Sequence, residues 1–202
     1  MNSGPMAFMR GLTFPGGQQP VLHGHDVYLR YPRMSDYANW AATRGESREF
    51  LAPWEPAWAG DELSKSAFRR RIKRYQKDTR LDSAYAFFVF RKSDDALLGG
   101  CTLSNVRRGV TQCCALGYWI GERFARQGHM FDALRALLPF IFSTLGLHRI
   151  EAACLPSNEP SKNLLAKVGF RQEGLARGYL QINGEWRDHA LFALLADEAP
   201  VG

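Results

Sequence analysis

The fold is decided by the stretch Ala115–Leu145, ALGYWIGERFARQGHMFDALRALLPFIFSTL. Its first residues predict a strand, because Tyr118, Trp119 and Ile120 all favour a pleated backbone. The rest predicts a long helix with one apolar face, because apolar residues recur at steps of three and four: Phe131, Leu134, Leu138, Ile141, Phe142 and Leu145. Pro139 interrupts this pattern, and we expect it to kink or end the helix.

Between the strand and the helix lies a short basic turn, Arg126–Met130. Backbone N–H groups at a helix N-terminus lack intrahelical acceptors, and the helix dipole places partial positive charge there. Gly128 would let a phosphate approach the backbone, and Arg126 adds a planar fork of donors. The turn is a candidate site for a ligand that carries a pyrophosphate. An ordinary strand-to-helix connection accounts for the same spacing, so the spacing alone does not decide.

The composition predicts one soluble globular domain. The chain has 202 residues, of which 46% are hydrophobic and 23% charged, and no apolar run is long enough to span a membrane. We expect a loose arm over residues 1–24, one domain over residues 25–197 and a tail over residues 198–202. The arm is rich in Gly, Pro and Gln and lacks the apolar segment of a secretion signal.

The cysteines and the net charge limit the function classes. None of the cysteines (Cys101, Cys113, Cys114 and Cys154) has CxxC spacing, which argues against a zinc site or a disulfide scaffold and for a reduced cytoplasm. The formal charge of +6 favours an anionic partner such as nucleic acid, a ribosome surface or a polyphosphate cofactor. The basic clusters at residues 69–71, 73–74 and 107–108 are also typical of a solvated helix face.

The order of predicted elements indicates a mixed α+β fold with helices on both faces of the sheet. Three successive strands, 84–92, 96–106 and 112–121, should form an antiparallel meander. The long helix should join the third of these to a parallel strand. The other predicted elements are a strand at 25–33, a helix capped by Ser35, an aromatic loop at 50–58, a helix at 62–77, a strand at 148–155, a helix at 161–170 and a hairpin turning at Asn183-Gly184.

Three segments together resemble the GNAT family of acyl-CoA-dependent N-acetyltransferases: GYWIGERFARQGHM (117–130), HRIEAACLPSNEPSKNLLAKVGF (148–170) and GYLQINGEWRDHALFALL (178–195). The resemblance spans about residues 26–195. It is strongest to the RimJ/RimL branch, which acetylates the N-terminal amine of ribosomal proteins. SNVRRG (104–109) and FLAPWEP (50–56) point to the RimJ type within that branch. The implied fold has a mostly antiparallel sheet whose fourth and fifth strands splay apart.

The resemblance implies an acetyl-CoA site. The family's pyrophosphate segment, Q/R-x-x-G-x-G/A, falls on residues 125–130 and departs from the pattern at Ala125 and Met130. The pantetheine arm would lie in the splay, bonded to strand backbone, and an N–H near Ile120 would stabilise the tetrahedral intermediate. The implied cofactor-binding residues are Tyr118, Trp119, Ile120, Arg126, Gln127, Gly128, His129, Met130, Phe131 and Asn158. For Asn158, a helix cap is an equally good explanation.

The implied mechanism is direct attack of a neutral amine on the thioester. Ser161 matches the family position whose hydroxyl lies near the CoA sulfur and could protonate the leaving thiolate, although serine is also common at helix starts. Glu55 is the first candidate for the base, for binding the substrate amine, or for capping its loop. The other base candidates are Glu151, Asp188, His129 and His189. Asp188 next to Arg187 more often indicates a structural ion pair. No cysteine stands in a recognisable Cys-His arrangement, which argues against a cysteine nucleophile.

The expected activity is therefore acetylation of the N-terminal α-amine of a protein, with a ribosomal protein as the expected partner. Two alternatives remain: the same chemistry on a small amine such as an antibiotic, a polyamine or an amino-acid conjugate, or a ribosome- or RNA-binding module that keeps an idle acyl-CoA fold. The sequence leaves open whether the chain is a monomer or a homodimer.

Overall fold

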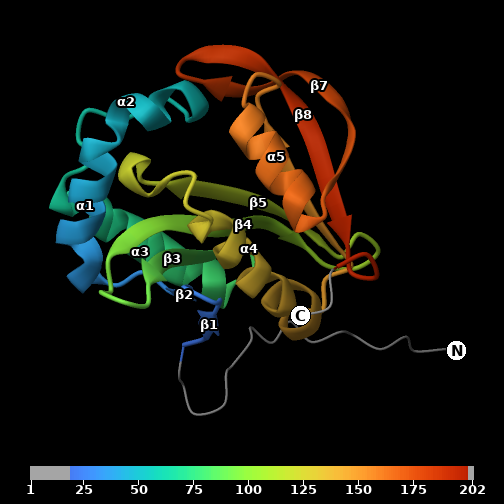
Figure 1. Ribbon diagram of the computed structural model, residues 1–202, viewed down its shortest axis with the longest axis horizontal. Coiled ribbons are helices and arrows are strands. Elements are labelled where there is room, and N and C mark those ends of the chain that lie inside the picture. The colour runs from blue at the N-terminus through green and yellow to red at the C-terminus, as the bar shows by residue number, and fades with distance from the viewer. Residues whose placement is uncertain (1–18, 200–202) are drawn as a thin grey trace, which may run out of the picture.

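The computed structural model describes residues 19–199, and its centre is one eight-stranded sheet (Figure 1). The strand order is β1-β2-β3-β4-β5-β6-β8-β7, and only the β5–β6 pair is parallel. The mixed, mostly antiparallel sheet and the meander β3–β4–β5 are confirmed. The strands are β1 (Val21–His23), β2 (Val27–Arg30), β3 (Tyr85–Arg91), β4 (Leu97–Arg107), β5 (Cys113–Ile120), β6 (Arg149–Cys154), β7 (Arg171–Ile182) and β8 (Glu185–Leu195).

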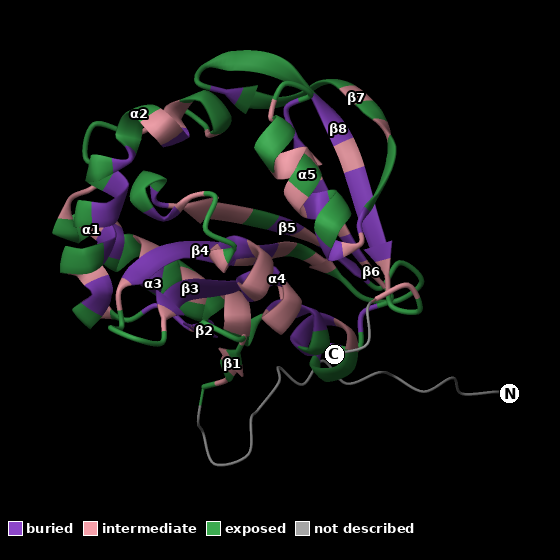
Figure 2. Cartoon of the chain, viewed as in Figure 1, coloured by how far each residue is buried: buried purple, intermediate pink, exposed green. Residues whose placement is uncertain are grey.

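Helices cover both faces of the sheet, as expected. On one face α1 (Tyr37–Glu46) and α3 (Lys65–Arg80) bury Trp40, Phe68 and Ile72 against the sheet. On the other face α4 (His129–Pro139) and α5 (Glu159–Val168) contribute to the larger apolar cluster. Figure 2 shows the buried residues following the strands between these two layers. The long amphipathic helix is thus α4, and burying its apolar face holds it on the sheet.

Helix α4 ends at Pro139, and a π-helical turn, Phe140–Thr144, follows it. Proline has no N–H for the i−4 carbonyl, so the predicted break is confirmed. Helix α5 also ends as predicted, because Gly169 adopts the left-handed conformation (φ 114°) that terminates helices. In the β7–β8 hairpin both turn residues, Asn183 and Gly184, have positive φ, as a two-residue turn of the I′ type requires.

Three local predictions differ from the structure. Ser35 does not cap the first helix: it lies inside a 3₁₀ turn, Met34–Asp36, whose Asp36 carboxylate accepts the N–H of Arg33 at 2.7 Å. The aromatic loop at 50–58 is partly helical, with α2 (Arg48–Leu51) followed by a 3₁₀ turn, Ala52–Trp54. Proline is tolerated in a first helical turn, where its missing N–H removes no bond.

The third difference is in the arm expected over residues 1–24. Residues 1–18 lie outside the described part of the chain, but Val21–His23 forms β1 and pairs with β2. The Asp132 carboxylate on α4 accepts the N–H groups of residues 25–27 at 2.7, 2.7 and 3.1 Å. A Cβ on Gly24 would lie 2.5 Å from an oxygen of Asp132, so the close approach requires glycine. These bonds fasten the start of α4 to the sheet.

Candidate active site

The parallel strands β5 and β6 separate halfway along β5. Cys113–Leu116 pair with Arg149–Ala152, whereas Gly117–Ile120 have no partner on β6 in the described structure. The same four residues stay paired with β4 on their other side. The Gly121 N–H bonds to the Leu98 carbonyl at 2.8 Å, so Ile120 is a non-hydrogen-bonded position towards β4 and its N–H points into the gap. The predicted splay is confirmed, and it offers backbone groups to an extended ligand.

The two faces of this gap differ in chemistry because side chains alternate along β5. Tyr118 and Ile120 pack against the cluster under α4 and α5, whereas Trp119 packs against the cluster under α1 and α3. We call these the α4 face and the α1 face. A ligand on the α4 face and a ligand on the α1 face would be separated by little more than the thickness of one strand.

The turn at the start of α4 can bind an anion. Gly128 is its N-cap and has φ 85°, and a Cβ there would meet nothing within 4 Å, so the left-handed backbone rather than crowding favours glycine. Arg126, Gln127 and Gly128 are exposed. Within residues 19–199 the N–H groups of residues 128–131 have no hydrogen-bond acceptor. Orphaned donors at a helix N-terminus fit a diphosphate.

The side chains of the other residues predicted to bind the cofactor at this turn are occupied by contacts within the protein or are partly buried. Met130, which departs from the family pattern, is 6% exposed, and its sulfur lies 3.7 Å from that of Cys101 in the core. The Gln127 amide donates to the Arg123 carbonyl at 2.7 Å. His129 and Phe131 are half-buried, and the Lys167 ammonium lies 4.6 Å from the centre of the Phe131 ring.

Asn158 and Ser161 begin α5 on the α4 face. Asn158 caps the helix by accepting the Ser161 N–H at 3.1 Å, as the alternative explanation for this residue expects. The Ser161 hydroxyl lies 2.6 Å from the Tyr118 hydroxyl. Burial raises the pKa of Tyr118 and outweighs the opposing effect of its hydrogen bond with Ser161, so this phenol stays protonated.

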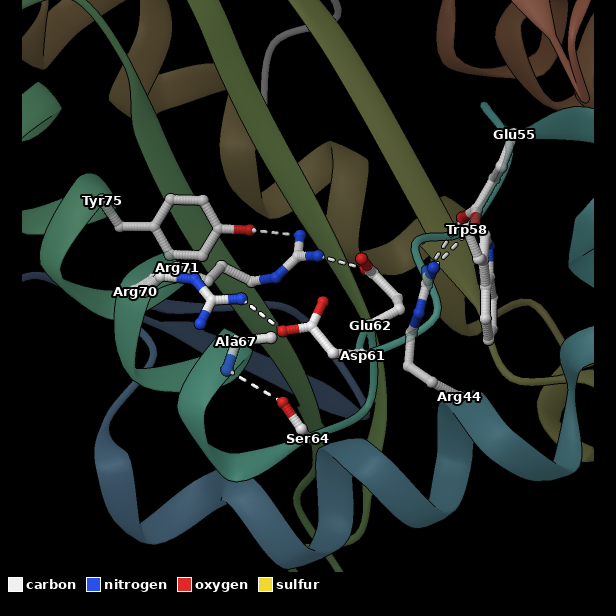
Figure 3. Close-up of polar contacts among 10 residues, drawn as sticks. All are labelled: Arg44, Glu55, Trp58, Asp61, Glu62, Ser64, Ala67, Arg70, Arg71 and Tyr75. Carbon is white, nitrogen blue, oxygen red and sulfur yellow. Dashed lines mark hydrogen bonds and ion pairs between the residues drawn. The ribbon is translucent and has the colours of Figure 1, made fainter.

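Glu55 is fixed by its neighbours on the α1 face (Figure 3). Its carboxylate accepts two bonds from the Arg44 guanidinium, at 2.8 and 2.7 Å, and one from the Trp58 indole at 2.9 Å. The Arg44 side chain is 8% exposed and that of Glu55 is 20% exposed. The guanidinium carbon of Arg44 lies 4.5 Å from the Trp58 ring and 4.9 Å from the Trp119 ring. Through Arg44, Glu55 is therefore connected to the splayed segment of β5.

A second contact joins the Glu55 segment to the C-terminal hairpin. The Asn183 N–H, at the tip of the β7–β8 hairpin, donates to the Glu55 carbonyl at 3.0 Å. Figure 1 shows the hairpin reaching over to the region of α2. The two segments together form an arch on the α1 side of the gap.

Towards the N-terminus of β5 from this arch, the α1 face is open to solvent. Gly117 is exposed, and a Cβ there would meet nothing within 4 Å. Ala115, two residues before Gly117 on β5, lines a groove of about 570 Å³ together with Asp78, Ser104, Arg107, Glu151 and Tyr179. This groove can hold a segment of polypeptide next to the gap.

The other base candidates have structural partners. Glu151 accepts bonds from Arg107 and Arg149, both at 3.0 Å. Asp188 accepts the Gly178 N–H at 2.8 Å. Arg187 pairs with Glu185, so the ion pair considered between Asp188 and Arg187 is wrong.

His189 is 2% exposed and its Nδ1 lies 3.0 Å from the Arg187 carbonyl. His129 is the first residue of α4, on the opposite face of the sheet from Glu55. Nothing in the structure places either histidine beside Glu55.

Sequence analysis did not single out Arg44, Trp58 or the Tyr118 hydroxyl. Tyr118 meets Ser161 across 43 residues and Arg44 meets Glu55 across 11, and no local pattern gives a signal for such contacts. Trp58 lies only three residues from Glu55, inside the aromatic loop that the sequence indicates. Within the described residues no group of His, Cys, Asp and Glu side chains is arranged to hold a metal ion. None of the helices described there combines the length and the hydrophobicity needed to cross a bilayer.

Comparisons with known proteins agree with this geometry. Residues 26–171 match the acetyltransferase (GNAT) domain family. The chain is 37% identical to the [ribosomal protein uS5]-alanine N-acetyltransferase of Escherichia coli over 182 residues, which cover 90% of this chain and 89% of that protein. Among solved structures, Mycobacterium smegmatis RimJ in complex with CoA-disulfide matches with TM-score 0.84 and 33% identity, covering 91% of this chain and 90% of the other.

The ribosomal-protein-S5-alanine acetyltransferase of Vibrio fischeri matches with TM-score 0.82 and 29% identity, covering 90% of this chain and all (100%) of the other. The family match, the identity to full-length relatives and the splayed sheet lead to one conclusion. The chain belongs to the GNAT family of N-acetyltransferases, is of the RimJ type, and uses acetyl-CoA as its acyl donor.

Proposed function

We propose that this protein acetylates the N-terminal α-amine of a ribosomal protein in the cytoplasm, by direct attack in a ternary complex. The observation that carries the proposal is the gap between β5 and β6, which is accessible from both faces of the sheet. The α4 face offers free N–H donors and the Ser161 hydroxyl. The α1 face has Glu55 at one end of the splayed segment and an open groove that begins at Ala115, beyond its other end. The names of the relatives support the choice of a ribosomal protein.

On the α4 face, the chain's own groups account for cofactor binding. The N–H groups of residues 128–131, with Arg126 beside them, bind the diphosphate. The unpaired edge of residues 117–120 binds the pantetheine arm as an added strand would be bound, with Asn158 beside it. Acetyl-CoA, when bound, supplies the activated thioester. The Ile120 N–H, which points into the gap, would then stabilise negative charge on the thioester oxygen, and we assign the Ser161 hydroxyl to the sulfur.

On the α1 face, little basicity is needed. A free α-amine has a pKa of about 8, against about 10.4 for lysine, so a useful fraction is already neutral at pH 7. We assign to Glu55 the attraction of the α-ammonium group and the acceptance of its proton. Arg44 and Trp58 hold the carboxylate in one orientation, which favours a fixed angle of attack.

The groove favours a polypeptide acceptor over a small amine. A small molecule would need only the space at the gap, whereas the groove begins two residues beyond Gly117, at Ala115, and reaches Asp78 and Arg107. Ion pairs on the surface count against the alternative of an RNA-binding module. In the basic clusters, four of seven side chains are paired with carboxylates: Arg70 with Asp61, Arg71 with Glu62, Arg107 with Glu151 and Arg108 with Asp82.

The test is thiol release from acetyl-CoA with peptides that reproduce ribosomal-protein N-termini. The same peptides with a blocked α-amine, and a panel of small amines, serve as controls. We expect turnover only with free α-amines of peptides. Turnover confined to small amines would support the small-molecule alternative. Saturable acetyl-CoA binding without turnover on any amine, together with salt-dependent RNA affinity, would indicate an idle fold.

A further inference from the structure

We propose that the Tyr118 hydroxyl is a positioning group that aims the single proton of Ser161 at the sulfur of the leaving thiol. The inference deepens the proposed function and rests on it. It assigns a role to the Tyr118 side chain, distinct from that of the backbone of the same residue.

The proposal follows from hydrogen-bond accounting at the 2.6 Å contact between the two hydroxyls. A serine hydroxyl has one proton, so Ser161 can donate either to Tyr118 or to a third atom. The Tyr118 hydroxyl also lies 3.5 Å from the Ser161 carbonyl, so within residues 19–199 Tyr118 has acceptors only on Ser161. If Tyr118 is the donor, the oxygen of Ser161 is the acceptor, and its own proton is available to a sulfur. That sulfur is either that of Cys154, whose pKa is raised by burial and lowered by the Ser161 hydroxyl, or that of a bound thiol. The Ser161 backbone is fixed independently, because its N–H bonds to the Asn158 side chain at 3.1 Å. Two contacts from different elements therefore set where the free proton points.

Tyr118 suits the role of donor better than that of acid. Burial raises the pKa of its phenol, so giving up the proton on the α4 face is unfavourable. A group that keeps its proton can orient a neighbour throughout the reaction cycle. The packing of the ring against the α4-face cluster does not need the hydroxyl, so the two roles of Tyr118 can be separated by mutation.

The step balances as follows. The amine nitrogen forms a bond to the carbonyl carbon, and its proton passes to Glu55 or to water. When the carbon–sulfur bond breaks, its electron pair goes to sulfur, and Ser161 donates its oriented hydrogen to that sulfur as a hydrogen bond. The proton that completes the thiol comes from water, so the proton lost by the amine equals the one gained by the thiol.

A double-mutant cycle tests this role. Tyr118→Phe keeps the ring and removes the hydroxyl, and Ser161→Ala removes the aimed proton. We expect kcat to fall about a hundredfold in Ser161→Ala and about tenfold in Tyr118→Phe, with the Kd of acetyl-CoA within about twofold of wild type. The double variant should be no slower than Ser161→Ala, because Tyr118 acts only through Ser161. Tyr31→Phe is the matched control, because its hydroxyl is buried and has no partner within residues 19–199.

Several outcomes would overturn the inference. They are wild-type kcat in Tyr118→Phe, losses that multiply in the double variant, or a loss that appears in the Kd of acetyl-CoA instead of kcat. Wild-type kcat in Ser161→Ala would remove both Tyr118 and Ser161 from the mechanism. Failure of the proposed function is distinguishable, because wild-type protein would then be inactive on peptides. If it acetylates a small amine, the same cycle applies with that amine.

Discussion

Tyr118 and Trp119 are neighbours on β5 whose side chains project from opposite faces of the sheet, one reaching Ser161 and the other packing against Arg44. The segment that carries them is paired with β4 but not with β6. One short piece of backbone therefore separates the α4 face, where we propose that acetyl-CoA binds, from the α1 face, where we propose that the acceptor amine binds. The proposed reaction takes place across this piece, and the predictions below test the two faces separately.

On the acceptor face, Glu55→Gln should lower turnover about a hundredfold while the Kd of acetyl-CoA stays within about twofold of wild type. The substitution keeps the size of the side chain and removes its charge. Steady-state kinetics and calorimetry measure the two quantities. Glu62→Gln is the control, because Glu62 also pairs with an arginine, Arg71, but belongs to the α3 ion pairs. A wild-type rate in Glu55→Gln would remove Glu55 from the reaction.

The proposed path of the acceptor along the α1 face, between the groove and Glu55, is tested by Gly117→Phe. An aromatic residue suits an exposed strand position, and space is open there, so the fold should be retained. The ring should obstruct the α1 face and raise the KM for a peptide acceptor at least about tenfold, which is about 1.4 kcal/mol of lost binding. Binding of acetyl-CoA should be unchanged. Equal peptide KM values in Gly117→Phe and Gly117→Ala would show that the acceptor does not pass this residue.

The cysteines should be unreactive in the folded protein. Burial raises the pKa of Cys101 and of Cys114 to about 12, and burial also raises that of Cys154. Protonated thiols are poor nucleophiles, so a thiol reagent at pH 8 should modify the cysteines only after unfolding. Folded-state pKa values above the unfolded value of about 8.5 also mean that this contribution to stability is complete below pH 8 and is lost as the pH rises from about 9 to 12. Rapid labelling of native protein would contradict this prediction.

The anchoring of α4 by Asp132 should be measurable as stability. Asp132→Ala removes the acceptor of three backbone N–H groups and should lower the free energy of unfolding by about 2 kcal/mol. For a domain of this size that corresponds to a fall in Tm of about 5 °C. Asp132→Asn, which keeps one acceptor oxygen, should lie between the two. An unchanged Tm in Asp132→Ala would show that the β1–β2 turn does not hold the helix.

Predictions from local patterns succeeded where the structure depends on neighbouring residues. The strand, turn and helix of residues 115–145 follow from apolar periodicity, and the hairpin follows from Asn183-Gly184. The Ser35 cap failed because residues 34–36 form a 3₁₀ turn before α1, which leaves Asp36 at the N-cap position without a side-chain cap bond. The resemblance to a family, rather than any pattern of spacing, directed attention to Asn158 and Ser161.

The contacts that build the candidate site on the two faces of β5 were beyond local patterns. Arg44 meets Glu55 across α2 and approaches Trp119 from a different part of the chain. Tyr118 meets Ser161 only because β5 and α5 come together on the folded sheet. Such contacts depend on tertiary packing, which periodicity does not encode.

The central claim is that the diphosphate of acetyl-CoA binds over Gly128, and calorimetric titration of acetyl-CoA into Gly128→Glu tests it most directly. Gly146→Glu is the matched control, because Gly146 also has positive φ and open space at its Cβ but lies outside the turn. We predict that Gly128→Glu abolishes binding by placing negative charge among the donors, whereas Gly146→Glu binds as wild type does. Unchanged affinity in Gly128→Glu would contradict the account.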